Sequence, residues 1–275
     1  MRSFLPLHAT LLLLATAASL PAQQRGAEMD DRRWLENCRD GWSGDDRNRA
    51  CEVRNVPVKL TGRAIEIDGQ QNGSIRALAW DGDSVRVTAR IQSSAETQKS
   101  AEALLAGVRV MADGRRVSAD GPRRLDDHER WSVSYLVMVP RHFDLTLDAN
   151  NGSLGVTGVD GKLELRTTNG SVALNDVGGD VHAHTQNGSL NVQLVGKRWD
   201  GRGLDAETQN GSVRLSLPEG YAALLETGTV NGRINTDFPI TVQGRIGREL
   251  SVPLNGGGPT IRARTTNGSV SLLRR

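Results

Sequence analysis

The sequence predicts an all-β protein, built mainly as a β-solenoid-like stack of coils of about 18 residues with Asn-Gly corners. Three observations support this fold class. The tripeptide Asn-Gly-Ser recurs along the 275-residue chain, apolar and polar residues alternate around each copy, and aromatic residues make up only 4% of the chain. Alternation with a period of two residues indicates strands that bury one face. The scarcity of aromatic residues means that small and branched side chains must fill the core.

The repeat is defined by the positions of its asparagines. After Asn151 the steps to the next copies are 18, 18, 23, 21 and 36 residues. Because 36 is twice 18, we expect a degraded copy before the last one, with Glu249-Leu250 in the Asn-Gly position and residues 251–254 as its strand. The repeat asparagines are Asn72, Asn151, Asn169, Asn187, Asn210, Asn231 and Asn267.

Aliphatic residues keep a fixed distance from these asparagines. They lie six and four residues before each Asn and three and five residues after it. Around Asn169 these residues are Leu163, Leu165, Val172 and Leu174. The extra residues of the 23-residue step fall at 195–205, on the side of the coil opposite the Asn-Gly corner.

Two structures fit this pattern. Asn-Gly between alternating runs is a strong hairpin signal, because both residues tolerate positive φ. Alternatively, Asn-Gly is the corner at which one coil of a solenoid turns. The uniform period favours the solenoid, because identical coils stack with like residues over like. The asparagines would then form a column along one ridge.

Residues 1–22 have the pattern of an export signal. A basic residue is followed by the apolar stretch 5–20 and by Pro21-Ala22 before Gln23. The apolar stretch is shorter than the roughly 20 residues that a membrane span needs, and no later stretch is apolar enough. We therefore expect an exported protein, located in the periplasm, at the cell surface or outside the cell.

Residues 23–54 precede the repeat domain and contain both cysteines of the chain. In an oxidising compartment Cys38 and Cys51 are most simply one disulfide. Closing so short a loop stabilises the fold by about 3 kcal/mol in the chain-entropy model. A redox or metal role is the alternative, although the spacing does not match Cys-x-x-Cys. We expect this segment to cap one end of the stack.

The repeat domain covers residues 55–275, with its main repeats at 143–275. Residues 64–91 alternate around Asn72 in the same way as the main repeats. Residues 95–106 then predict a short helix capped by Ser93 or Ser94. Residues 107–121 predict a hairpin, and residues 131–140 predict a strand that leads into the main array.

Three stretches resemble a known family. They are "AWDGDSVRVTAR" (79–90), "YLVMVPRHFDLTLDANNGSL" (135–154) and repeats such as "VDGKLELRTTNGSVAL" (159–174). Over roughly residues 55–275 the chain resembles the bacterial putative-adhesin β-strand-repeat family, a domain of unknown function. The resemblance implies an exported or envelope-associated protein with no defining catalytic activity and no site residues to carry over.

Outward-facing side chains on neighbouring coils would lie about 4.8 Å apart. Asp148 with Arg166, and His184 with Glu207, would then form complementary rungs. A second hypothesis, an enzyme, rests on the same face. Glu164, His182 and Asp205 would place an imidazole between two carboxylates, with His184 two residues along.

Such a cluster could be a weak metal site, or an acid/base cluster of the kind that β-helical polysaccharide enzymes carry on one sheet. The alternative is a solvated charge ladder that sets the register of the coils, each pair contributing roughly 0 to 1 kcal/mol. The small number of histidines favours the ladder.

The function that these observations favour is adhesin-like binding or scaffolding without catalysis, cofactor or metal. The charge is nearly balanced, with 34 basic and 32 acidic residues, which gives no support for nucleic acid as a partner. The expected partner is an envelope or surface ligand, either a glycan or a protein. It would contact the stacked outer faces and the insertion that contains Asp200. Trp199, in the same insertion, is either an exposed binding residue or folds back over the end of its coil.

Overall fold

The computed structural model describes residues 22–40, 47–237 and 248–275. The predicted export signal lies outside the described residues except for Ala22.

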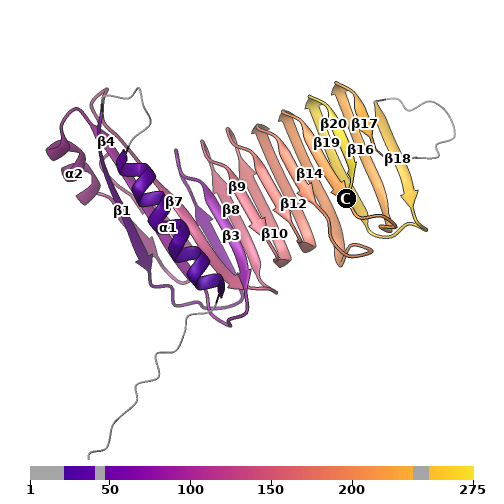
Figure 1. Cartoon of the computed structure of the whole chain (residues 1–275), viewed down its shortest axis with the longest axis horizontal. Coiled ribbons are helices and arrows are strands. Elements are labelled where there is room, and N and C mark those ends of the chain that lie inside the picture. The colour runs from indigo at the N-terminus through magenta and orange to yellow at the C-terminus, as the bar shows by residue number, and fades with distance from the viewer. Residues whose placement is uncertain (1–21, 41–46, 238–247) are drawn as a thin grey trace, which may run out of the picture.

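The described chain forms two helices and twenty strands (Figure 1). The helices are α1 (Ala22–Asp40) and α2 (Gln98–Ala106). The strands are β1 (Asn48–Val56), β2 (Ala64–Asp68), β3 (Ile75–Trp80), β4 (Arg86–Ala95), β5 (Arg109–Ala112), β6 (Arg116–Asp120), β7 (Arg130–Pro140), β8 (Asp144–Ala149), β9 (Leu154–Thr157), β10 (Asp160–Thr167), β11 (Val172–Asn175), β12 (Gly178–Asn187), β13 (Leu190–Gln193), β14 (Gly201–Asn210), β15 (Val213–Leu217), β16 (Ala223–Asn231), β17 (Ile234–Thr236), β18 (Glu249–Leu254), β19 (Thr260–Asn267) and β20 (Val270–Arg274). The all-β prediction is confirmed.

The strands form two ten-stranded sheets. Sheet A has the order β1-β4-β7-β3-β9-β11-β13-β15-β20-β17, and sheet B has the order β18-β16-β19-β14-β12-β10-β8-β2-β6-β5. Their inner faces share one hydrophobic core of buried, mostly aliphatic side chains that runs from Val56 to Leu272. As predicted, small and branched residues supply nearly all of this core.

From β8 to β15 the chain alternates between the two sheets, and each strand pairs in parallel with the strand one coil away. Like residues lie over like in both sheets. In sheet B the stacked residues include Leu145, Leu163, Val181 and Leu204, and in sheet A they include Leu154, Val172, Leu190 and Val213. Each Asn-Gly lies where the chain leaves sheet B for sheet A. The hairpin alternative therefore fails here, because β10 and β11 do not pair with each other.

The stack does not follow the order of the sequence at its C-terminal end. Strand β19 lies between β14 and β16, and β20 lies between β15 and β17. The last coil in the sequence is thus inserted before the one that precedes it. In chain order Asp205 would lie beside Glu226, and like charges directly opposite each other destabilise a sheet. The insertion puts Arg262 between them.

The prediction of a degraded coil at residues 249–254 is wrong. These residues form β18, which pairs antiparallel with β16 at the edge of sheet B. They lack the Asn-Gly pair that holds the other coils in parallel register. A uniform stack of parallel coils is also wrong at the N-terminal end, where β1, β4 and β7 pair antiparallel and extend sheet A.

Helix α1 was not foreseen from the sequence. It lies across the outer face of sheet A at the N-terminal end of the molecule (Figure 1). The predicted disulfide between Cys38 and Cys51 is present and joins α1 to β1. Arg90 of β4 adds ion pairs to Asp30 and Asp31, at 2.8 and 2.7 Å. Helix α1 therefore covers this end of sheet A, and β1 forms its edge strand.

The remaining N-terminal predictions have mixed outcomes. The hairpin at 107–121 is confirmed as β5 and β6, and the strand at 131–140 is confirmed as β7. The short helix begins later than expected, at Gln98, and its cap is Thr97, whose hydroxyl accepts from the amide of Ser100. Ser93 and Ser94 instead belong to β4.

Neither helix of the described segments has the length and apolar character that crossing a membrane requires.

Candidate functional site

The repeat asparagines form a single column along one ridge of the stack. Each side-chain amide except that of Asn72, which ends the column, donates to the side-chain oxygen of the asparagine one coil away, at 2.7 to 3.0 Å. In spatial order the column contains Asn72, Asn151, Asn169, Asn187, Asn210, Asn267 and Asn231. We call this set the Asn column.

At most of these corners, a buried threonine two residues before the asparagine adds a further hydrogen bond. Its hydroxyl donates to the carbonyl of the corner glycine in the adjacent coil. Thr185 donates to Gly170 and Thr208 donates to Gly188, both at 2.7 Å. The corner is therefore held by side-chain hydrogen bonds as well as by the strands on either side.

The corner glycine is required for a different reason from the one that a hairpin would give. Gly152, Gly170, Gly188 and Gly211 are not among the residues with positive φ. A Cβ on any of them would instead overlap the carbonyl oxygen of the corner glycine one coil away. Glycine is conserved from coil to coil within this chain because the backbones approach too closely for any other residue.

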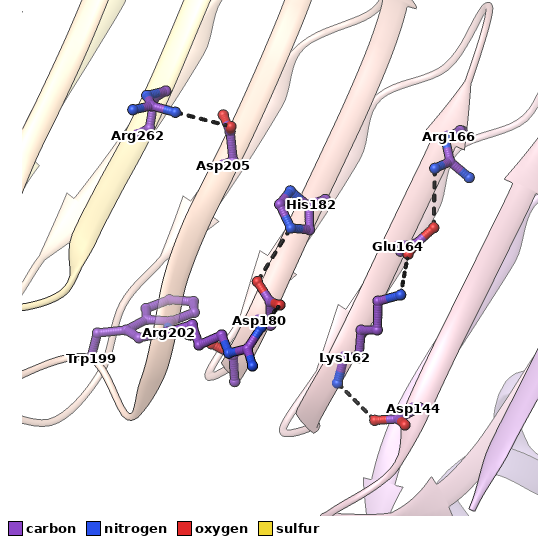
Figure 2. A network of polar contacts seen from close by, with 11 residues as sticks. Asp144, Lys162, Glu164, Arg166, Asp180, His182, Trp199, Arg202, Asp205 and Arg262 are labelled. Carbon is purple, nitrogen blue, oxygen red and sulfur yellow. Dashed lines mark hydrogen bonds and ion pairs between the residues drawn. The ribbon is translucent and has the colours of Figure 1, made fainter.

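Outside the core, sheet B carries a continuous array of charged and imidazole side chains, which we call the polar face (Figure 2). On β10, β12, β14 and β19 its members are Lys162, Glu164, Arg166, Asp180, His182, His184, Asp205, Glu207, Arg262 and Arg264. The strand register places Glu164, His182 and Asp205 at one height on three neighbouring strands. It also places Asp148 beside Arg166 and His184 beside Glu207. The predicted rungs are thus neighbours in space.

The contacts on this face do not join Glu164, His182 and Asp205 to one another. Glu164 pairs with Lys162 at 2.8 Å and with Arg166 at 3.0 Å, both on its own strand. The hydrogen bond from Lys162, helped by Arg166, holds the pKa of the Glu164 carboxyl below its usual value.

The other two candidate residues also pair elsewhere (Figure 2). His182 Nε2 lies 3.2 Å from Asp180 Oδ1, and Asp180 also contacts Arg202 at 3.4 Å. Asp205 pairs with Arg262 at 3.2 Å, and Arg262 also reaches Glu226 at 2.8 Å. Sequence reasoning missed Asp180 and the central position of Arg262. The signal for Arg262 was the clash of Asp205 with Glu226 in a stack that follows the chain order.

The face is shallow where the candidate residues meet. A hollow of about 150 Å³ is lined by side chains that include Glu164, His182, His184 and Asp205. Ligand pockets usually measure roughly 300 to 1,000 Å³. The side chain of His182 is 56% exposed. Among the described residues, no three histidine, cysteine or acidic side chains come together as a set of metal ligands.

Trp199 lies inside the stack and not on its surface. It is 3% exposed, and its indole nitrogen donates to the carbonyl of Gly179 at 3.0 Å. It folds back over the end of its coil and is not an exposed binding residue, which were the two predicted alternatives. The insertion still exposes Lys197, Arg198 and Asp200.

A comparison with protein families finds one match. The family described as Toastrack DUF4097 matches residues 124–273, which is more than half of the chain. No curated protein sequence matches.

Solved structures with a related arrangement share little sequence. One, described as a "putative cell adhesion protein" from Clostridium sporogenes, is 10% identical over 83% of this chain and 100% of its own, with a TM-score of 0.43. A "putative adhesin" from Bacteroides fragilis is 11% identical over 82% and 97%, with a TM-score of 0.35. A "putative lipid binding protein" from Parabacteroides distasonis is 10% identical over 82% and 96%, also at 0.35. Likeness at this level supports no inference about function.

Proposed function

We propose that this chain, which belongs to the Toastrack DUF4097 family, is an exported, non-enzymatic binding or scaffolding protein of the cell envelope. Its family agrees with the resemblance seen in the sequence. Its ligand contacts the polar face of sheet B. The role is adhesin-like in the sense that an extended surface, and not a catalytic pocket, makes the contact.

One observation carries this proposal: three of the four candidate catalytic side chains, Glu164, His182 and Asp205, are already paired along a shallow face. Glu164 is held by two cations of its own strand, and Asp205 is held by Arg262. A general acid or base must have a free position for substrate within hydrogen-bond reach. A ladder of paired charges instead offers many weak, repeated contacts, which suits an extended ligand.

The parallel part of the molecule supports the finer assignment as a β-solenoid with Asn-Gly corners. Strands β8 to β15 alternate between two sheets, and the Asn column marks the same corner in every coil. In such a stack, additional coils lengthen the polar face without changing its chemistry. This is the property that a scaffold needs.

The pattern of the first residues and the disulfide both support export. Helix α1 begins at Ala22, so cleavage after the predicted signal would leave almost the whole helix on the mature chain. A structural disulfide between Cys38 and Cys51 is typical of an oxidising compartment. Cell fractionation with N-terminal sequencing tests this part. We expect an envelope or secreted fraction that starts near Gln23, and a cytoplasmic protein that retains Met1 would contradict it.

The binding proposal is tested by capture from an envelope extract. We compare the mature protein with the double variant Arg166→Glu/Arg264→Glu, which reverses two exposed charges of the polar face. Arg214→Glu, on the outer side of sheet A, is the matched control. We expect the control to capture the same component as the wild type and the double variant to lose it. Equal capture by all three proteins would contradict a role for the polar face.

The enzyme hypothesis is tested separately with His182→Ala/His184→Ala. A wild-type protein that hydrolyses or cleaves an envelope glycan, and loses that activity in this variant, would overturn the non-enzymatic proposal. We expect no turnover by either protein.

A further inference from the structure

A second surface feature lies at the first corner of the stack. A pocket of about 290 Å³ opens between the corner at residues 68–72 and the segment that connects β6 to β7. Its volume is close to the lower end of the range for small-molecule sites. The lining residues include Asp68, Gln70, Gln71, Ala119, Pro122, Arg123, Leu125, Trp131, Val133 and Tyr135.

The buried part of this lining contains an unpaired hydroxyl. Tyr135 is 2% exposed, and its hydroxyl oxygen has no hydrogen-bond partner among the residues that the structure describes. The other buried lining residues are Gly69, Ala119 and Val133, and none of them offers a polar side chain there. Burying a hydroxyl without a partner costs free energy, so such a group calls for an explanation. A ligand that hydrogen-bonds to it supplies one.

An aromatic side chain beside this hydroxyl is fixed in place. The indole nitrogen of Trp131 donates to the carbonyl of Pro122 at 3.0 Å. Gly121 lies so close to the indole that a Cβ there would press on the ring. Trp131 is therefore a rigid platform, and exposed Leu125 adds apolar surface at the rim. Rigid aromatic residues are the usual anchors of binding sites, because holding them costs little entropy.

The corner that forms the opposite wall differs from the other corners. Between Asp68 and Asn72 the chain takes four steps, whereas the equivalent residues Asp148 and Asn151 are three apart. The extra residue is accommodated by Gln70, which has a positive φ of 52°. The backbone amide of Gln70 donates to the carboxylate of Asp68, and its side-chain amide donates to the carbonyl of Ala119. Extra residues with unusual backbone conformations concentrate at functional sites.

We propose that this pocket binds one sugar ring, the terminal pyranose of an envelope or surface glycan. A pyranose has an apolar face of C–H groups and a rim of hydroxyls. The apolar face fits the indole of Trp131, and the rim hydroxyls fit the Tyr135 hydroxyl and the Asp68 carboxylate. The proposal goes beyond the proposed function, because it adds a binding site outside the polar face.

The charges of the pocket favour a neutral ligand. The carboxylate of Asp68 is compensated by Arg116 at 2.6 Å, and Arg123, the other charged lining residue, lies 3.8 Å from Asp120, so neither an anion nor a cation gains much there. Burial, together with the negative charge of Asp68, raises the pKa of the Tyr135 phenol. The hydroxyl is therefore protonated at all physiological pH values and can both donate to and accept from a sugar hydroxyl.

The test titrates the mature protein with a panel of neutral monosaccharides and short oligosaccharides, by saturation-transfer NMR and calorimetry. Tyr135→Phe is the informative variant, because it removes only the unpaired hydroxyl and is not expected to lower the melting temperature. Tyr221→Phe, in the other buried tyrosine of the chain, is the matched control. Trp131→Ala is a second variant that removes the platform.

We expect a sugar of the panel to bind the wild type and Tyr221→Phe equally, to bind Tyr135→Phe at least 10-fold more weakly, and not to bind Trp131→Ala. Equal affinity for Tyr135→Phe and the wild type would overturn the proposal, as would absence of binding to any neutral sugar. The proposed function fails separately, if the wild type captures nothing from an envelope extract. Capture that persists in Tyr135→Phe and Trp131→Ala, with no sugar bound, leaves that function intact and overturns only the pocket.

Discussion

The side-chain amide of Asn267 donates to the side-chain oxygen of Asn210 at 2.7 Å, although 57 residues separate them in the sequence. Asn231, which lies between them in the chain, is on the far side of Asn267. The Asn column thus records the spatial order of the coils, which is not the order of the sequence at the C-terminal end. That order decides which charges are neighbours on the polar face.

Gly188→Ala tests the close approach of the corners. Its Cβ would overlap the carbonyl oxygen of Gly170, so we expect the free energy of unfolding to fall by more than about 2 kcal/mol. Gly155→Ala is the control, because a Cβ there meets only Arg76 Cγ at 3.9 Å. Chemical denaturation of both variants checks this. Equal stability of the two would show that the glycines are not required for packing.

Asn187→Ala tests the Asn column at an interior position. It removes one hydrogen bond to Asn169 and one to Asn210. Because the column is exposed, water replaces part of the loss, and we expect a decrease of about 0.5–1.5 kcal/mol in the free energy of unfolding. Asn191→Ala, outside the column, should change it by less than about 0.5 kcal/mol. If the Asn column contributes nothing to stability, the two variants would have the same free energy of unfolding.

Arg262→Ala tests the inserted position of the last coil. Arg262 lies between Asp205 and Glu226 and pairs with both. The side chain is about one-third exposed, so we expect a loss of roughly 0.5–1 kcal/mol after allowance for solvent screening. The loss should shrink at high salt. Screening weakens the ion pairs of Arg262, and it also weakens the repulsion between Asp205 and Glu226 that remains in the variant. Stability that is unaffected at low salt would contradict these pairings.

Asp148→Asn and Glu164→Gln should have opposite effects at neutral pH. Burial raises the pKa of the Asp148 carboxyl, so its charge costs stability above the folded pKa, and the cost disappears as pH falls through that value. Asp148→Asn should therefore raise the melting temperature near neutral pH and have no effect in acid. Lys162 lowers the pKa of the Glu164 carboxyl, so that charge stabilises above the unfolded pKa, and the gain is lost as pH falls through the folded pKa.

Glu164→Gln should accordingly lower the melting temperature near neutral pH and have no effect in acid. Melting curves of both variants and the wild type from acidic to neutral pH measure these changes. A shift of the same sign in both variants would show that the environments of the two carboxyls are wrongly assigned.

The sequence was sufficient for the parallel coils because their alternation and spacing are local and repeat many times. Leu163, Leu165, Val172 and Leu174 are all buried as predicted. The neighbouring pairs Asp148 with Arg166 and His184 with Glu207 could be predicted directly from the spacing of the coils. The reason for the glycine at each corner could not be predicted from the sequence, since close approach between coils is visible only once the coils are stacked.

The features that the sequence did not predict depend on long-range contacts. The insertion of β19 and β20 and the antiparallel edge strand β18 leave no periodic signal. Helix α1 is largely polar, and it is positioned by the disulfide and by Arg90. The pocket at Tyr135 joins the corner at residues 68–72 to residues 119–135, at least 47 positions later in the chain, and only the extra residue before Asn72 marked it in the sequence.

The order of the coils is tested most directly by cross-linking within the Asn column. Adjacent members are about 4.8 Å apart across paired strands, within the range in which two cysteines form a disulfide. The account predicts that Asn210→Cys/Asn267→Cys forms a disulfide on mild oxidation, detected as a linked peptide by mass spectrometry, and that Asn210→Cys/Asn231→Cys does not. A linked peptide from the second pair and none from the first would contradict it.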